Sequence, residues 1–143
     1  MTEALALDWT DIRRDCRLLA AKLGGRGPFA GIVAVTRGGL VPAALLAQDL
    51  DIRVIETVCV ASYDERLRGT VEILKGLPGD GEGWLVVDDL ADSGATARAV
   101  RALLPKAHLA ALYAKPDGLA DLDTFVRTIA QSVWIEFPWE AGE

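Results

Sequence analysis

The chain has 143 residues, of which 51% are apolar and 25% charged, a composition typical of a single soluble α/β domain. Its net charge of −6 argues against a nucleic-acid-binding protein, because nucleic-acid phosphates attract basic surfaces. The sequence shows no signal peptide and no apolar run long enough to span a membrane. We therefore expect a cytoplasmic protein whose cysteines, Cys16 and Cys59, are reduced thiols.

The N-terminal part of the chain predicts two helices and two strands. Apolar residues recur at three- and four-residue steps over residues 9–23, which predicts a helix with Asp8 as its N-cap. Asp15 falls largely outside this apolar stripe. Turn residues and apolar runs then predict a strand over 31–36, a helix over 40–50 and a strand over 54–61.

Residues 62–83 are polar and charged and contain several glycines, so we interpret them as a mobile loop with a short strand at 71–74. The elements that follow are a strand over 84–88, a helix over 95–104, a strand over 108–115, and strands over 125–130 and 133–137. The last two are expected in a small C-terminal hood within residues 116–143. Alternating strands and helices predict one domain, 1–143, with an open parallel sheet flanked by helices. The ligand site of such a sheet lies at the carboxyl ends of its strands.

The most informative segment is WLVVDDLADSGAT, residues 84–96. A buried strand is followed by Asp88 and Asp89 and then by a loop of small residues that opens into a helix. Loop amides and a helix N-terminus attract a phosphate group, and hydroxyl side chains add donors. Carboxylates bind sugar hydroxyls or a hydrated Mg²⁺. The segment therefore predicts a site for a phosphorylated sugar, with the phosphate held by Asp92, Ser93, Gly94, Ala95 and Thr96.

Chemistry-bearing residues stand at the ends of three predicted strands: Arg37-Gly38-Gly39, Asp88-Asp89 and Lys115. Each is weak evidence alone, since the first could be only a tight turn and the lysine a solvated surface group. An adjacent aspartate pair also occurs in the acidic pocket of receiver domains, but there it lies near the start of the chain. Because strand ends converge on one crevice in a doubly wound sheet, their joint occurrence favours a functional site.

The 84–96 segment resembles the 5-phosphoribosyl-1-diphosphate (PRPP) binding motif of type I phosphoribosyltransferases. The similarity to one branch, the bacterial xanthine-guanine phosphoribosyltransferases, extends from Trp9 to Trp139 and includes AVTRGGLVPAALLA, ETVCVASYD, GDGEGWLVVDDLADSGATA, PKAHLAALYAKP and VWIEFPW. The resemblance implies transfer of the 5-phosphoribosyl group from PRPP to guanine, xanthine or hypoxanthine, with Mg²⁺. It also implies a homo-oligomer, either dimer or tetramer, and peripheral association with the inner membrane.

For PRPP, the resemblance assigns the metal or its waters to Asp89 and the ribose hydroxyls to Asp88. The pyrophosphate would contact backbone amides of the Arg37-Gly38-Gly39 turn, where related enzymes carry a cis peptide bond. Two residues of the usual Thr-Gly-Gly-Thr phosphate loop are replaced, by Ser93 and Ala95. The family's mobile-loop arginine aligns with Gly69, so Arg68 or Arg66 is the candidate for that pyrophosphate contact.

For the purine, the resemblance places Asp92 opposite N7, where it would take the proton lost as N9 becomes the nucleophile. The alternative for Asp92 is an N-cap of the following helix. Lys115 would donate to the 6-oxo group and Ile135 would offer its backbone carbonyl. Trp134 would either stack on the base or pack in the core. The lone histidine, His108, is interpreted as structural.

Two other functions remain open from the sequence. One is a non-catalytic regulator that senses PRPP, which the replacement at Gly69 favours slightly. Retention of the candidate base Asp92 favours an enzyme, because a sensor needs no base. The other is a phosphoribosyltransferase for a different base.

Overall fold

The structure is a computed structural model in which residues 3–62 and 70–140 are described. Its strands and α-helices are β1 (Ala4–Ala6), α1 (Trp9–Leu23), β2 (Gly31–Thr36), α2 (Leu40–Leu50), β3 (Ile55–Ser62), β4 (Val71–Lys75), β5 (Trp84–Ala91), α3 (Ala95–Leu103), β6 (His108–Ala114), β7 (Thr124–Thr128) and β8 (Trp134–Glu136). Short 3₁₀ turns span Leu119–Asp121 and Pro138–Glu140. The predicted helices and most strands agree with these bounds to within a residue or two.

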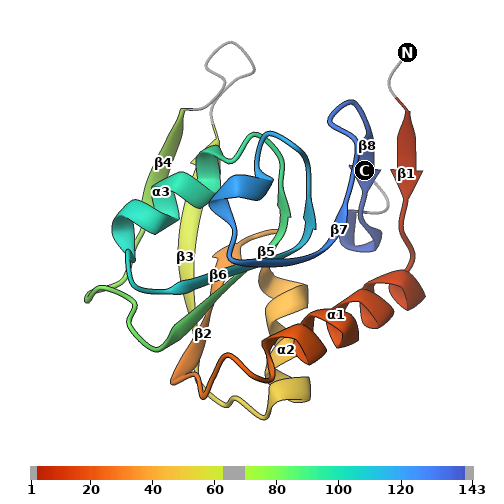
Figure 1. Cartoon of the computed structure of the whole chain (residues 1–143). Helices are drawn as coiled ribbons and strands as arrows, with labels where there is room; N and C mark the ends of the chain where they lie inside the picture. Colours follow the sequence, from red (N-terminus) through yellow and green to blue (C-terminus); the bar gives the residue numbers. More distant parts are fainter. Residues whose placement is uncertain (1–2, 63–69, 141–143) are drawn as a thin grey trace.

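The main sheet has six strands in the order β4-β3-β2-β5-β6-β7 (Figure 1). Every neighbouring pair is parallel except β3–β4, which is antiparallel. The α/β class is therefore confirmed, with an antiparallel edge that the sequence analysis did not predict. Since β2, β5 and β6 are adjacent and parallel, their carboxyl ends meet at one edge of the sheet.

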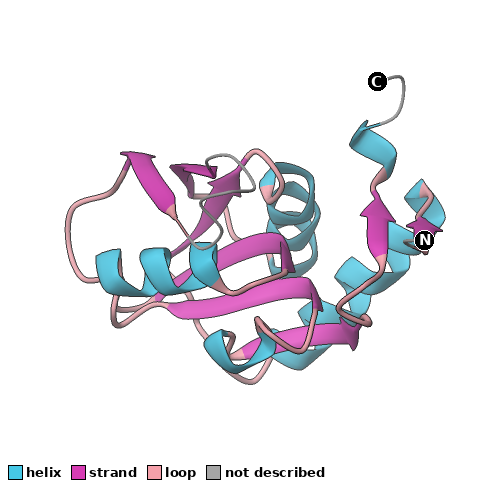
Figure 2. Ribbon diagram, turned by 90° about the horizontal axis from the view of Figure 1, so that it is seen from above, coloured by secondary structure: helices cyan, strands magenta, loops and turns pink. Residues whose placement is uncertain are grey.

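Two segments differ from the predicted loop and hood. Residues 71–75 form β4 and extend the main sheet, whereas residues 63–69 lie outside the described residues. In the predicted hood, β7 joins the main sheet beside β6, and only β8 stands apart from it, paired with β1 (Figures 1 and 2). Strand periodicity identifies a strand but not its partner, and β1 is too short to show any periodicity.

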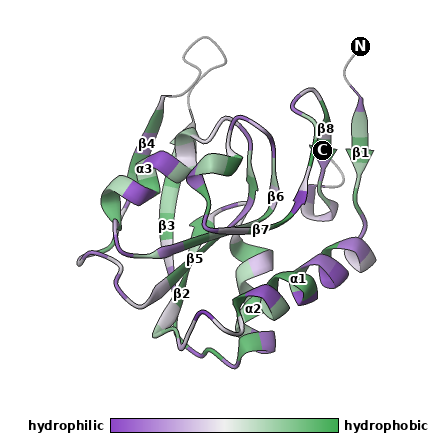
Figure 3. Cartoon of the chain, in the orientation of Figure 1, coloured by the Kyte–Doolittle hydropathy of each residue, from purple (hydrophilic) through white to green (hydrophobic). Residues whose placement is uncertain are grey.

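The main sheet buries both of its faces. On β2, Ile32 and Ala34 pack in one cluster with α1 and α2, while Val33 and Val35 pack in a second cluster with Val100 of α3. This alternation explains why the central strands read as continuous apolar runs, which Figure 3 shows as green ribbon. None of the helices in the described ranges has the length and hydropathy needed to cross a bilayer.

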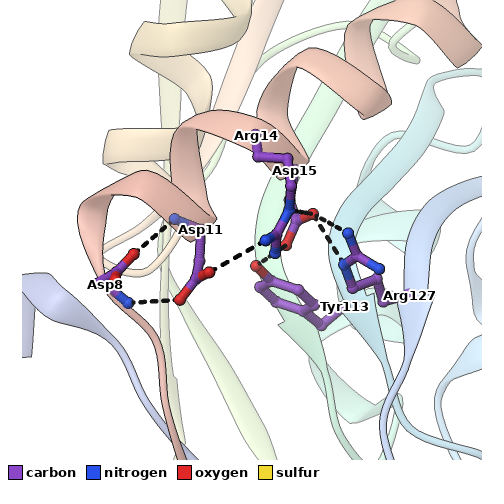
Figure 4. Close-up of polar contacts among 6 residues, drawn as sticks. All are labelled: Asp8, Asp11, Arg14, Asp15, Tyr113 and Arg127. Atoms are coloured by element: carbon purple, nitrogen blue, oxygen red, sulfur yellow. Dashed lines mark hydrogen bonds and ion pairs between the residues drawn. The ribbon is translucent and has the colours of Figure 1, made fainter.

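The predicted N-cap of α1 is confirmed. The same helix also carries a buried ion cluster that the sequence did not predict. The side chains of Asp8 and Asp11 each accept from the other's backbone amide, forming a capping box. Asp15, which the sequence placed largely outside the apolar stripe, is instead fully buried. It accepts hydrogen bonds from Tyr113 (2.5 Å), Arg127 (2.9 Å) and Arg14 (3.1 Å), as Figure 4 shows. These contacts tie α1 to β6 and β7.

The sequence predicts a structural role for His108 and reduced thiols for both cysteines. His108 Nε2 lies 2.7 Å from Thr124 Oγ1, and burial lowers the pKa of this histidine. Both cysteines are free thiols; Cys16 is buried, which raises its pKa to about 12, and Cys59 is half-buried. The interpretation of His108 as structural agrees with these contacts.

Candidate active site

The acidic pair lies within β5, which runs three residues further than the predicted end at Asp88. The two side chains are half-buried, and the backbone amide of Asp89 donates to Asp88 Oδ1 at 2.8 Å. Burial raises the pKa of both carboxyls, and the proximity of Asp89 raises the pKa of Asp88 further. Neither carboxylate forms an ion pair with any side chain in residues 3–62 and 70–140. The pair therefore concentrates carboxyl groups that no described side chain neutralises through an ion pair.

The Arg37-Gly38-Gly39 turn packs directly against this pair. A Cβ atom on Gly38 would lie 2.5 Å from Asp89 Oδ2, so a larger residue there would require the Asp89 carboxylate to move. The amide of Gly39 donates to Val35 O at 2.8 Å, and the peptide bond between Thr36 and Arg37 is cis, as the family resemblance implied. Sequence reasoning assigned the glycines to pyrophosphate approach and missed this close packing against Asp89.

The phosphate loop links β5 to α3. Gly94 has φ = 88°, a conformation that favours glycine, and Ser93 Oγ accepts from the amide of Ala95 at 3.2 Å. Arg98 of α3 also holds the loop, donating to Ser93 O (3.3 Å) and to Asp121 (2.8 Å). The amides of Gly94 and Thr96 have no acceptor within the described part of the chain. A helix N-terminus with free amides is suited to an anion.

Asp92 faces Lys115 across the ends of β5 and β6. Lys115 is only 4% exposed, and its Nζ lies 3.4 Å from Asp92 Oδ2. Gln131 Nε2 donates to Asp92 Oδ1 at 2.8 Å. The alternative role of Asp92 as a helix cap is wrong, because Gly94 occupies the N-cap position and no side chain bonds there. The carboxylate is turned toward the cleft instead, where Lys115 and Gln131 hold it.

The residues predicted to contact the base lie on β8. Trp134 is 61% exposed, which excludes core packing for its side chain. Ile135 is buried, but its backbone is available: Trp134 N donates to Glu3 O and Glu136 O accepts from Leu7, so these alternate residues face β1. In a parallel pair the intervening residue directs its N–H and C=O to the opposite side. Ile135 therefore presents, on the side away from β1, a carbonyl with no partner among residues 3–62 and 70–140.

A cleft of about 770 Å³ joins most of these groups. Its lining includes Thr70, Asp88, residues 92–98, Asp117, Gln131 and Trp134. Arg37 is exposed at the neighbouring turn, and Asp89, Lys115 and Ile135 contact or adjoin lining residues without themselves lining the cleft. Arg68, Arg66 and Gly69 lie outside the described residues. Sequence reasoning missed Gln131 and Arg98, because neither belongs to a motif and each is recognisable only by its contacts.

Comparisons with known proteins identify the family of this chain. The family model described as "Phosphoribosyl transferase domain" matches residues 7–143. A xanthine-guanine phosphoribosyltransferase of Desulfotalea psychrophila is 51% identical, over 94% of this chain and 84% of the relative. One of Chromohalobacter salexigens is 48% identical, over 98% of this chain and 86% of the relative. The crystal structure of a purine phosphoribosyltransferase from Pyrococcus horikoshii superimposes with a TM-score of 0.80 at 31% identity, covering 99% of this chain and 96% of that one. The chain belongs to the phosphoribosyltransferase family.

Proposed function

We propose that this protein is a purine-salvage enzyme that transfers the 5-phosphoribosyl group of PRPP to guanine or xanthine, and also to hypoxanthine. The observation that carries the proposal is the contact between Asp92 and buried Lys115, which combines a proton acceptor and a donor at the cleft. The relatives that are 48–51% identical are xanthine-guanine phosphoribosyltransferases, which supports the same substrates.

PRPP binds across the strand ends in this proposal. Its 5-phosphate occupies the loop of Ser93, Gly94, Ala95 and Thr96, where the amides of Gly94 and Thr96 are unpaired within the described chain. Asp88 accepts hydrogen bonds from the ribose hydroxyls. The pyrophosphate lies toward Arg37, whose exposed guanidinium supplies a positive charge at the turn.

The acidic pair fits a magnesium site. Mg²⁺ is typically bound through one or two carboxylates together with waters and substrate phosphates. Asp88 and Asp89 supply two half-buried carboxyls of raised pKa, and no cluster of three or more metal-ligating side chains occurs among the described residues. Asp89 would hold the ion or its waters. When bound, Mg²⁺ neutralises and orients the departing pyrophosphate.

The chemistry at the base follows from Asp92 and Lys115. The N9–C1′ bond forms while the C1′–O bond to pyrophosphate breaks, and the electrons of the broken bond leave with the pyrophosphate. Asp92 takes the proton that the purine loses, and the Lys115 ammonium donates to the 6-oxo group, which accumulates negative charge. Trp134 stacks on the ring and the carbonyl of Ile135 accepts from its edge.

An enzyme is favoured over a PRPP sensor by this arrangement. A sensor requires the phosphate loop but has no need for an aspartate held between a buried lysine and a glutamine. A preference for 6-oxopurines over other bases is favoured by Lys115, which has three donors and no acceptor.

The test is pyrophosphate release from PRPP with guanine, xanthine, hypoxanthine and adenine, each with and without Mg²⁺. We expect metal-dependent turnover of oxopurines and rejection of adenine by roughly 10⁴–10⁵, because its 6-amino group would face the ammonium and leave donors unpaired. Lys115→Met should reduce oxopurine turnover and so erode the discrimination. PRPP binding without turnover of any base would indicate a sensor, and adenine turnover near one-hundredth of the guanine rate would contradict the role of Lys115.

A further inference from the structure

Gln131 lies in the turn between β7 and β8, and its side chain connects two other loops of the cleft. Its Oε1 accepts from the backbone amide of Asp117, in the loop after β6, at 2.9 Å. Its Nε2 donates to Asp92 Oδ1, in the loop after β5, at 2.8 Å. The same nitrogen lies 3.4 Å from the backbone oxygen of Asp92. Gln131 thus joins the loops after β5 and β6 to the segment that carries Trp134.

The orientation of this amide is determined by its partners. A backbone N–H can only donate, so the group facing the Asp117 amide has to be the oxygen of Gln131. The NH₂ group is then left facing the carboxylate of Asp92, which can only accept when ionised. The opposite orientation would place two donors together at Asp117 and two acceptors together at Asp92.

Asp92 depends on this contact for its position. Its side chain is 54% exposed, and the Lys115 contact on its other oxygen is 3.4 Å, longer than a typical ion-pair hydrogen bond of about 2.7–2.9 Å. With Gln131 on Oδ1 and Lys115 on Oδ2, the carboxylate is held from both sides. An ionised carboxylate has about four acceptor sites, so these two contacts leave room for an N–H of the base.

We propose that Gln131 is a positioning residue for the transfer reaction, holding the Asp92 carboxylate in the orientation that accepts the purine proton. The inference rests on the proposed function. Gln131 acts through Asp92 and does not contact the reacting atoms. Because Gln131 precedes Trp134 by three positions in the β7–β8 segment, the same short segment positions both the base and its proton acceptor.

The test compares two substitutions that separate anchoring from positioning. Gln131→Glu keeps an oxygen that can accept from the Asp117 amide, but removes the donor and adds a negative charge beside Asp92. Gln131→Met removes both contacts at similar length. Ser132→Ala, at the exposed neighbouring position, is the matched control. Steady-state kinetics with guanine and PRPP should be measured for all three, with circular dichroism to monitor folding.

We expect kcat to fall by about 10–100-fold in Gln131→Met and at least as far in Gln131→Glu, the range of one hydrogen bond to a charged group. The KM for PRPP should change by no more than about twofold, because the phosphate loop is untouched, and Ser132→Ala should match the wild type. Near-wild-type kcat in Gln131→Glu with a loss in Gln131→Met would show that Gln131 only anchors Asp117. Unchanged kcat in both variants, or loss of folding in both, would also overturn the inference. Wild-type protein inert toward every oxopurine would contradict the proposed function instead.

Discussion

Asp15 and the pair Asp88 and Asp89 are all removed from solvent to some extent, but their pKa values shift in opposite directions. Asp15 on α1 is fully buried but accepts hydrogen bonds from Arg14, Tyr113 and Arg127 (Figure 4). Burial by itself would raise its pKa, yet these contacts outweigh burial and the pKa is lowered. Asp88 and Asp89 on β5 are only half-buried, but burial raises the pKa of both carboxyls. No described side chain forms an ion pair with them that would offset this effect.

The contrast distinguishes a carboxylate that stabilises the fold from carboxylates that we propose bind a ligand. A paired buried charge has its desolvation cost offset within the folded chain, whereas an unpaired one raises the free energy of the unliganded fold. A ligand that brings positive charge recovers that cost on binding. The following substitutions test whether the two groups differ in this way.

The largest effect is expected from Asp89→Asn. Turnover should fall by about 10³–10⁴, because a metal-held pyrophosphate is worth several kcal/mol of transition-state stabilisation. The Mg²⁺ concentration needed for half-maximal activity should rise, while the melting temperature should not fall. Asp80→Asn, at an exposed turn away from the cleft, is the control and should behave as wild type. Full activity of Asp89→Asn at ordinary Mg²⁺ would remove the metal role from this residue.

Asp92 is intermediate between the two groups, since its carboxylate has a lysine partner but remains exposed. Asp92→Asn should reduce kcat by about 10²–10⁴, the usual contribution of a general acid–base group. The KM for PRPP should stay close to wild type, because the phosphate loop and the acidic pair are retained. Normal turnover in a folded Asp92→Asn variant would show that Asp92 does not accept the purine proton.

Asp15→Ala should lower stability instead of activity. The loss should be about 2–3 kcal/mol, below the ~3–5 kcal/mol of a fully buried ion pair, because the side chains of Arg14 and Arg127 are 48% and 43% exposed and can be solvated. Urea unfolding measures this. Asp49→Ala, which removes the surface ion pair with Arg13, should cost no more than about 1 kcal/mol.

The contribution of Asp15 to folding stability should decrease as the pH falls. A carboxyl whose pKa is lowered in the folded state stabilises the fold above its unfolded value of 3.8 and loses that contribution as the pH falls through the folded pKa. The stability difference between wild type and Asp15→Ala should therefore shrink only under acidic conditions below about pH 4. A difference that stays constant down to pH 2 would contradict the ionised state of Asp15.

The sequence predicted the central sheet well because its signals are local. Residues 31–36 and 84–87 are continuous apolar runs, and the glycines at 38, 39 and 94 mark the turns that follow the strands. The predicted family is confirmed by a family model that matches residues 7–143, far beyond the central sheet. Placement of Asp88, Asp92 and Lys115 around one cleft followed from the rule that parallel strands end at the same edge.

What the sequence did not predict depends on contacts between distant segments. Asp15 falls largely outside the apolar stripe of its helix, but its partners Tyr113 and Arg127 are about a hundred positions away, and no local signal pairs them with it. β7 looked like part of a hood because its partner β6 cannot be identified from periodicity. The contact of Gln131 with Asp92 has the same origin, since an isolated glutamine in a turn matches no motif.

Asp88→Asn is expected to have the smallest effect on stability and the opposite sign to Asp15→Ala. Because the pKa of Asp88 is raised in the folded state, its ionisation opposes folding, and its contribution to stability declines as the pH rises from the unfolded value of 3.8 through the folded pKa. An uncharged amide removes this penalty, so unliganded Asp88→Asn should be more stable at neutral pH by roughly 0.5–2 kcal/mol, the usual gain from relieving a functional constraint. The advantage over wild type should disappear near pH 4 and below, where Asp88 is protonated.

Mg²⁺ with PRPP should stabilise the wild type more than the variant, because only the wild type regains the cost of its charge from the ligand. Thermal melts across pH, with and without this ligand pair, measure both effects. A variant less stable than wild type at neutral pH would show that Asp88 stabilises the fold as Asp15 does, and the distinction between the two groups would fail.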